Sequence, residues 1–313
     1  MNIPMESRRV HHRTRQAMAV AAIMAVAGTL LLARPQESQN EPVELSAVVL
    51  DDRDMPVRGL VEADFQVKEN GRAVMVTGFN SVATDASATR GRSIVLILGA
   101  AGTDPALTTR VQRIANAVMK RAGTGDQVSV VRYSKPKEEI AGDRQEMSMR
   151  IAEYRAITGA PLNAKTSQEV LDLVARISSD LARTEPRRHA IVAIGSPGVF
   201  DVIEPPQKSY ELNWPYWVKA LTAAGRANAS LYLIDPLGLT GRVRINPDGL
   251  IAQTGGTIFD NLNEFEKAID RIWAETGSYY RLEYLPAGDK REVQTIDVKV
   301  SRPGVKVRAR RSR

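Results

Sequence analysis

Few residue patterns in this sequence could support catalysis. No histidine other than His189 follows residue 12, and a catalytic histidine would need a nucleophile and an orienting carboxylate beside it. His189 directly precedes a predicted buried strand, so we interpret it as a strand-edge residue. The run Gly195-Ser196-Pro197-Gly198 lacks the G-x-S-x-G spacing of a nucleophile elbow and predicts a tight turn. The sequence therefore assigns no catalytic residue, and we expect the chain not to be an enzyme.

Cofactor chemistry is equally poorly supported. Neither Gly123-Thr124-Gly125 nor Thr254-Gly255-Gly256 is followed by the lysine of a phosphate-binding loop, and both predict helix ends or turns. The chain has no cysteine, which excludes disulfides, thiolate metal sites, a cysteine nucleophile and a lipid-modified cysteine anchor. We therefore predict no bound cofactor.

One stretch is unusually rich in aromatic residues. Tyr210, Trp214, Tyr216 and Trp217 lie within eight positions, after the segment Glu204-Pro205-Pro206. Aromatic side chains are enriched at recognition surfaces. We predict that Trp217 belongs to the core, whereas Tyr210, Trp214 and Tyr216 either cap a sheet or contact a partner.

The elements that position these residues follow from hydrophobic periodicity. Residues 92–278 alternate short apolar strands with amphipathic helices, which predicts crossover connections and a mainly parallel, doubly wound, Rossmann-like sheet with helices on both faces. The expected strands are 93–98, 127–133, 189–194 and 230–234, and the expected helices are 105–121, one beginning near Asp143 in a capping box, 166–183, 215–227 and 263–275.

Both flanks of this region predict β structure instead. Residues 43–80 contain strand-like alternation and Asn70-Gly71, a type I′ hairpin signal. A small, polar linker follows at 81–91, and residues 279–313 form a second β segment with a basic tail. Chain termini often lie close together, so the two β segments could form one small domain, but the sequence does not decide this.

The first 34 residues have the plan of an export signal. A basic start precedes an apolar stretch, and a polar spacer follows at 35–42. Ala25-Val26-Ala27 offers a cleavage site and Ser7-Arg8-Arg9 resembles a twin-arginine signal, yet a retained signal anchor remains an alternative. We expect an extracytoplasmic protein, periplasmic or secreted, with membrane contact only through a retained anchor.

Basic charge does not point to a nucleic-acid partner. The formal net charge is +7, and much of it lies in the leader and in the tail residues Arg308, Arg310, Arg311 and Arg313. We interpret this tail as a solvated end of the chain and predict no nucleic-acid partner.

A set of motifs, in this order and spacing, resembles the bacterial von Willebrand factor type A-related proteins, especially those abundant in Acidobacteria. The resemblance runs from about residue 43 to the C-terminus. Its carriers are Pro56-Val57-Arg58-Gly59-Leu60, Asp64-Phe65-x-Val67-x-Glu69-Asn70-Gly71, the strand from Ser93, Leu231-Tyr232-Leu233-Ile234-Asp235, Thr254-Gly255-Gly256, Ser278-Tyr279-Tyr280 and Arg302-Pro303-Gly304-Val305-Lys306-Val307-Arg308.

This resemblance implies a divalent-metal adhesion site, which the sequence does not preserve. Type A domains supply oxygen ligands from an Asp-x-Ser-x-Ser loop, a Thr and a further Asp, as Mg²⁺ or Ca²⁺ requires. The corresponding positions here are Gly99, Ala101, Thr103, Ala160 (with Thr158 nearby) and Ser196. No carboxylate remains among them, so we predict that no metal binds there unless Asp104 or Asp201 substitutes.

The resulting prediction is an exported, metal-independent module for protein–protein interaction. By resemblance its binding rim comprises loops 99–104, 158–163 and 195–217, with the candidate residues Thr103, Asp104, Thr158, Ser196, Tyr210, Trp214 and Tyr216. A purely structural role, a metal-dependent adhesion module with rearranged ligands and an envelope hydrolase are the alternatives.

Overall fold

The computed structural model of this chain describes the residues 42–83, 91–100, 105–133, 140, 142–156, 164–184, 187–200, 208–237, 249–260, 263–286 and 294–311. The predicted leader, 1–34, lies outside them, as do the spacer apart from Pro42 and most of the predicted linker. None of the described helices is long and apolar enough to cross a membrane.

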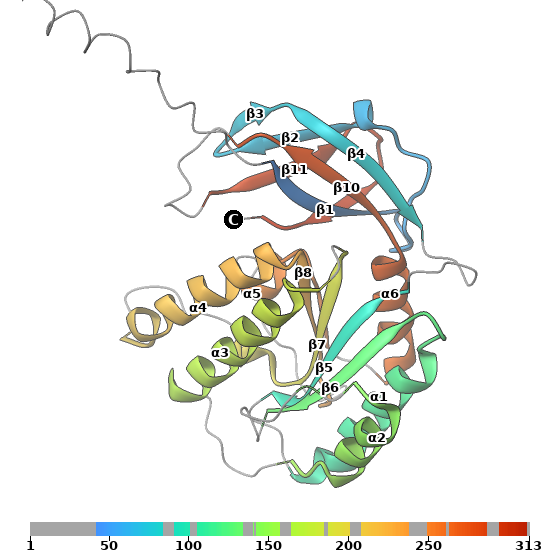
Figure 1. Cartoon of the computed structure of the whole chain (residues 1–313), viewed down its shortest axis with the longest axis vertical. Coiled ribbons are helices and arrows are strands. Elements are labelled where there is room, and N and C mark those ends of the chain that lie inside the picture. Colours follow the sequence, from blue (N-terminus) through green and yellow to red (C-terminus); the bar gives the residue numbers. More distant parts are fainter. Residues whose placement is uncertain are drawn as a thin grey trace, which may run out of the picture. The chain divides into compact units, whose positions relative to one another are not determined.

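A parallel sheet of five strands occupies the middle of the chain (Figure 1). Its order is β6-β5-β7-β8-β9, and every neighbouring pair is parallel. The strands are β5 (Ser93–Ala100), β6 (Gln127–Arg132), β7 (His189–Gly195), β8 (Ala229–Ile234) and β9 (Ile258–Phe259). The predicted parallel α/β architecture is therefore confirmed. Strand β9 was not predicted, because two residues are too few to show an apolar pattern.

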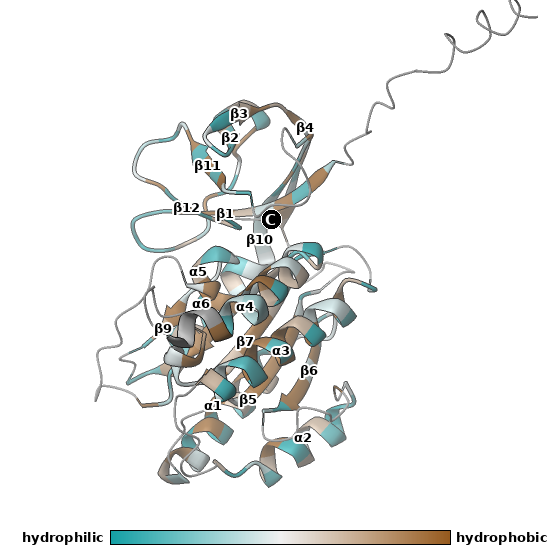
Figure 2. Ribbon diagram, turned by 90° about the vertical axis from the view of Figure 1, so that its left-hand side faces the viewer, coloured by the Kyte–Doolittle hydropathy of each residue, from teal (hydrophilic) through white to brown (hydrophobic). Residues whose placement is uncertain are grey.

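Helices cover both faces of this sheet, so its strands must be apolar on both sides. Val95 and Ile97 of β5 pack into one core cluster, whereas Ile94, Leu96 and Leu98 pack into the other. One face carries α3 (Ala164–Leu181), α4 (Lys208–Arg226) and α5 (Leu250–Gln253), and the other α1 (Thr108–Arg121), α2 (Arg144–Glu153) and α6 (Phe265–Gly277). Figure 2 shows the hydrophobic strands between these helices.

The two predicted β segments pair with each other. One antiparallel sheet has the order β12-β1-β10-β4, and a second has the order β11-β2-β3. Their strands are β1 (Val43–Leu50), β2 (Phe65–Glu69), β3 (Arg72–Val74), β4 (Val76–Ala83), β10 (Ser278–Tyr284), β11 (Ile296–Val300) and β12 (Lys306–Ala309). We call these two sheets the β region, and it shares the compact unit Glu41–Arg313 with the parallel sheet.

Short-range signals were reliable where side chains act on their own backbone. Asn70 and Gly71 have φ values of 49° and 76°, which are the left-handed angles that a type I′ turn requires. The Asp143 carboxylate accepts a hydrogen bond from the Glu146 N–H at 2.9 Å and caps α2.

Helix α4 begins earlier than its sequence indicates. The prediction placed its start at Pro215, but the helix begins at Lys208 and Pro215 lies inside it. Proline has no N–H, so the carbonyl of Glu211 loses its helical donor at this point. Packing of the helix against α3 and β8 outweighs this local cost. The linker prediction also began too early, because β4 extends to Ala83.

Candidate functional site

Only part of the predicted rim falls within the described residues. Gly99, Ser196, Trp214 and Tyr216 do, together with the backbone of Tyr210. Ala101, Thr103, Asp104, Thr158, Ala160 and Asp201 lie outside them. Because β5 and β7 are parallel neighbours, with Ala100 opposite Gly195, the structure brings Gly99 and Ser196 to the same edge of the sheet.

The surroundings of Gly99, which the resemblance aligns with the first metal-binding carboxylate of type A domains, exclude a side chain. Its φ of 74° is left-handed, which favours glycine. A Cβ added there would lie 2.3 Å from the hydroxyl oxygen of Tyr154, a side chain that is itself buried. Tyr154 thus fills space that a carboxylate at position 99 would need, and nothing in the sequence had marked it.

Gly99 and Ser196 cannot by themselves hold a divalent cation. Ser196 offers one hydroxyl and Gly99 offers no side chain. Among the described residues there is no group of three or more His, Cys, Asp or Glu side chains that could hold a metal. A hard cation bound without carboxylates would lack the charge that offsets its dehydration.

Asp235, at the end of β8, is a buried carboxyl group that the sequence interpretation missed. It is 1% exposed. Its Oδ1 accepts from the Leu237 N–H at 2.9 Å, and its Oδ2 has no hydrogen-bond partner among the described residues. Burial, together with the nearby charge of Asp260, raises its pKa. One feature of the sequence could have identified Asp235: it directly follows an apolar strand, at the end of a parallel sheet where ligands bind.

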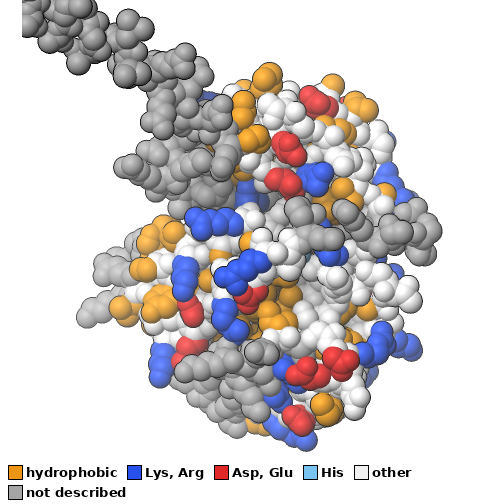
Figure 3. Space-filling model, in the orientation of Figure 1, with side chains coloured by type: hydrophobic (Ala, Val, Ile, Leu, Met, Phe, Trp, Pro, Cys, Tyr) orange, Lys and Arg blue, Asp and Glu red, His pale blue; other side chains and the backbone are white. Residues whose placement is uncertain are grey.

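The first half of α4 exposes an apolar surface, which we call the α4 surface and define as residues 212–217. Leu212, Trp214 and Tyr216 are 56%, 39% and 37% exposed, and Figure 3 shows hydrophobic side chains gathered at the left, over α4. Trp217, in contrast, is 6% exposed and packs into the core, as predicted.

A groove of about 520 Å³ adjoins this surface. Trp214 and Trp217 line one side, with ring centroids 5.1 Å apart and planes 12° from parallel. Residues of β11 and β12 line the other side. Trp214 therefore faces the β region, and no residue of β5 or β7 lines this groove.

Two buried polar atoms of the α4 surface have no hydrogen-bond partner among the residues that the structure describes. They are the Asn213 Oδ1, an acceptor, and the Trp217 Nε1, a donor. Residues four apart lie on the same face of a helix. An unpaired buried polar group is costly, so these atoms call for a functional or structural explanation.

His189 lies at the opposite, amino-terminal edge of the parallel sheet. Its Nδ1 is 2.8 Å from the Ser93 Oγ, its counterpart on β5. Its Nε2 is 3.5 Å from the Thr184 Oγ1, and that hydroxyl donates to the Leu181 carbonyl. The tautomer that satisfies both contacts carries its proton on Nε2, and its Nδ1 accepts from Ser93.

This imidazole is electrically neutral. Burial, with a contribution from the Arg187 charge, lowers the pKa of His189 to about 4. No carboxylate among the described residues hydrogen-bonds to it, so the pair lacks the third group that orients a catalytic histidine. The Ser93–His189 pair joins two strands 96 residues apart in sequence, which supports the strand-edge interpretation.

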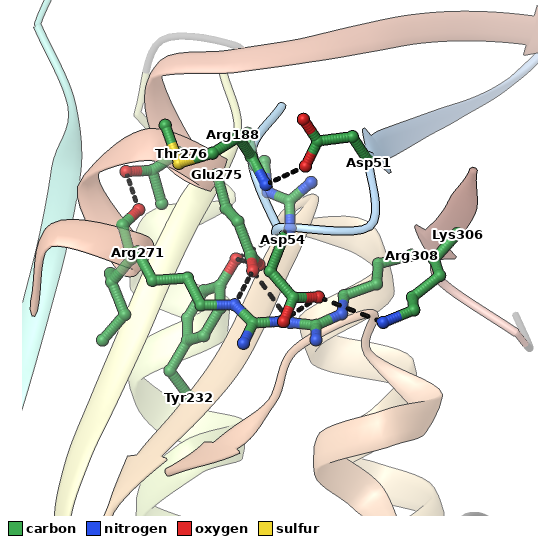
Figure 4. A network of polar contacts seen from close by, with 11 residues as sticks. Asp51, Asp54, Arg188, Tyr232, Arg271, Glu275, Thr276, Lys306 and Arg308 are labelled. Atoms are coloured by element: carbon green, nitrogen blue, oxygen red, sulfur yellow. Dashed lines mark hydrogen bonds and ion pairs between the residues drawn. The ribbon is translucent and has the colours of Figure 1, made fainter. Parts of the chain in front are cut away.

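A buried network of charges joins the β region to the α/β core (Figure 4). The Glu275 carboxylate, on α6, has no exposed side-chain surface. It accepts from the Arg271 Nε at 3.1 Å, the Arg308 Nη1 at 2.8 Å and the Tyr232 hydroxyl at 3.2 Å. The prediction that Arg308 belongs to a solvated tail is therefore wrong, because Arg308 is part of β12 and contacts Glu275.

Two further groups extend this network. Asp54, in the turn after β1, pairs with Arg271 at 2.9 Å and with Lys306 at 3.5 Å. Arg188, which is buried, donates to the Tyr232 hydroxyl at 3.0 Å. The network thus spans the turn after β1, the residue before β7, β8, α6 and β12, and its contacts identify it as a structural junction.

A comparison with protein-family models finds no match for this chain, and a search of curated proteins finds no matching sequence. Function is therefore inferred from the residues, their geometry and the resemblance described above.

Proposed function

We propose that this chain is an exported, non-enzymatic module that binds a partner protein without a divalent metal, as a member of the von Willebrand factor type A-related group. The observation that carries this proposal is the α4 surface, where Leu212, Trp214 and Tyr216 are exposed together beside a groove. Exposed apolar clusters rimmed by polar residues mark interaction sites.

The composition of this surface supports a protein partner. Aromatic residues are enriched in protein interfaces, and tryptophan and tyrosine are frequent among residues whose truncation costs most binding energy. Trp214 stacks on Trp217, so it is held in place before a partner arrives. A preorganised side chain loses little conformational entropy on binding.

Independence from metal is supported by the edge near Gly99. Glycine and one serine hydroxyl stand where type A domains supply carboxylates, and Tyr154 fills the adjoining space. At Gly99 and Ser196, Mg²⁺ or Ca²⁺ would find none of the anionic ligands that it prefers.

A capture experiment with the full chain tests this proposal. The wild type and a Trp214→Ala/Tyr216→Ala variant are incubated with envelope extract, each with and without EDTA. The variant Met149→Ala, which removes an apolar side chain of similar exposure from α2, is the matched control.

We expect one partner set that survives EDTA, is lost with the double variant and is kept by Met149→Ala. A partner lost on EDTA alone would contradict metal independence. The absence of any partner that distinguishes the two variants would contradict the interaction role.

One observation favours the metal-dependent alternative with rearranged ligands, namely the unpartnered Oδ2 of buried Asp235. A ligand that binds the native state raises thermal stability by mass action. Thermal unfolding of the wild type and of Asp235→Asn, with Mg²⁺, Mn²⁺, Ca²⁺ or EDTA, separates the two functions. We expect no metal-dependent shift in either protein; a shift in the wild type that Asp235→Asn abolishes would favour the alternative.

A further inference from the structure

We infer that the groove beside the α4 surface binds an extended polypeptide segment of the partner, which adds as a strand to the outer edge of β11. This inference rests on the proposed function and specifies the form of the partner.

Two strands that line the groove are the last strands of their sheets. β11 ends the sheet β11-β2-β3, and β12 ends the sheet β12-β1-β10-β4. An edge strand presents a row of N–H and C=O groups that another chain can pair with. The groove therefore offers backbone groups as well as apolar side chains.

The hydrogen bonds of β11 show which residues point outward. The Thr295 carbonyl accepts from the Asn70 N–H at 2.8 Å, toward β2. The Ile296 N–H donates to the Arg311 carbonyl at 2.6 Å, on the other side. Because successive residues alternate in direction, the backbone groups of Val298 and Val300 also face outward. Within the described part of the chain, no hydrogen bond joins either of them to another strand on that side.

The hydrogen bond from Ile296 to Arg311 connects the start of β11 to the residues that follow β12. Beyond it, Val298 of β11 and Val307 of β12 both line the groove. On β12, however, Gly255 covers the backbone of Ala309, since a Cβ at Gly255 would lie 2.9 Å from the Ala309 carbonyl carbon. The β11 edge is thus the less obstructed of the two.

The opposite side of the groove suits an extended chain with apolar side chains at alternate positions. The stacked rings of Trp214 and Trp217 form an aromatic surface. Strand addition combines these features, since main-chain bonds supply affinity and side-chain contacts supply selectivity.

The test uses displayed random ten-residue peptides selected on the full wild-type chain, with Trp214→Ala as counter-selection and Met149→Ala as control. Selected peptides are then synthesised in two further forms, each N-methylated at alternate residues and differing by one position. N-methylation removes a donor without changing the side chain, so only a peptide paired along one edge distinguishes the two forms. Binding is followed by tryptophan fluorescence.

We expect selected peptides with alternating apolar residues, bound at least about tenfold more weakly in one methylated form than in the other. Binding should also fall about tenfold or more in Trp214→Ala and stay unchanged in Met149→Ala. Equal effects of both methylated forms, or selection of proline-rich peptides, would overturn strand addition. Failure to select any peptide that depends on Trp214 would overturn it as well.

The two proposals can fail separately. A partner captured from the extract in a Trp214- and Tyr216-dependent way, together with no methylation pattern, would leave the interaction role intact and reject the strand. Loss of the capture difference would reject the interaction role itself.

Discussion

The network around Glu275 and the α4 surface differ in what they expose. Glu275 is fully buried and accepts three hydrogen bonds, two of them from arginines. The α4 surface, in contrast, exposes Leu212, Trp214 and Tyr216 beside a groove. Both regions hold buried polar atoms that have no hydrogen-bond partner among the described residues, namely the Arg188 Nε and Nη1 in the network and the Asn213 Oδ1 and Trp217 Nε1 in the α4 surface. Exposed apolar side chains, and not unpaired polar atoms, are therefore the feature that makes the α4 surface the candidate binding site.

This contrast assigns different roles to the two regions. Both are rich in large side chains, and both lie where the β region adjoins the α/β core. The network should dominate stability, and the α4 surface should dominate binding. Four measurements would sharpen or break that division.

The largest effect is expected for Glu275→Ala. Removal of Glu275 takes from Arg308 its carboxylate partner, while Arg271 keeps Asp54, and breaking such a buried pair costs about 3–5 kcal/mol of the free energy of unfolding. Urea unfolding measures it. The control Asp172→Ala breaks the exposed pair with Lys219 and should cost at most about 1 kcal/mol. Equal costs would mean that the network is not a structural junction.

A second effect concerns pH and His189. Its native pKa is about 4, below the ordinary value of 6.5, so between these values the unfolded chain binds a proton that the folded chain does not. Stability should therefore fall as the pH drops from 6.5 to 4, by about 3 kcal/mol from this group, and this group should have no effect above 6.5. Urea unfolding from pH 7 to 4, compared with His189→Asn, isolates this contribution; identical pH profiles would contradict it.

Gly99→Ala should cost about 1–3 kcal/mol of the free energy of unfolding. The alanine would have to adopt a left-handed φ, and its Cβ would collide with the Tyr154 side chain. Gly59→Ala provides a matched control, because Gly59 has a φ of 77° but nothing within 4 Å of its added Cβ. Thermal unfolding of both variants separates the cost of the left-handed φ from the cost of the contact with Tyr154. If both variants lose the same stability, Tyr154 moves aside and the edge has room for a ligand.

The smallest effect on stability is expected for Trp214→Ala/Tyr216→Ala. These side chains are partly exposed and Trp214 stacks on Trp217, so their joint loss should cost about 1–2 kcal/mol of the free energy of unfolding. Trp217→Ala, in the core, should cost about 3–5 kcal/mol. A large loss in the double variant would show that the α4 surface is structural, and the capture experiment would then lose its meaning.

Much of the fold was predictable because its signals are local. The apolar run of β5 can be stable only between two covered faces, and Asn70-Gly71 can adopt a turn that most residues cannot. Aromatic composition also drew attention to Trp214 and Tyr216. Pro215 misled the prediction of α4, because tertiary packing can hold a helix together across a proline.

The sequence by itself determined the alternation of strands and helices and the turns, and it places no carboxylate at the positions that the type A resemblance marks for a metal. Only the tertiary structure decided that the two β segments share sheets, that Glu275 joins Arg308, that His189 meets Ser93, and that Trp214 faces β11. The reason is physical. A turn or an apolar strand depends on residues close by in the sequence. The sequence around a glutamate or an arginine, in contrast, does not indicate whether water or a distant residue surrounds the side chain. Only long-range packing determines that.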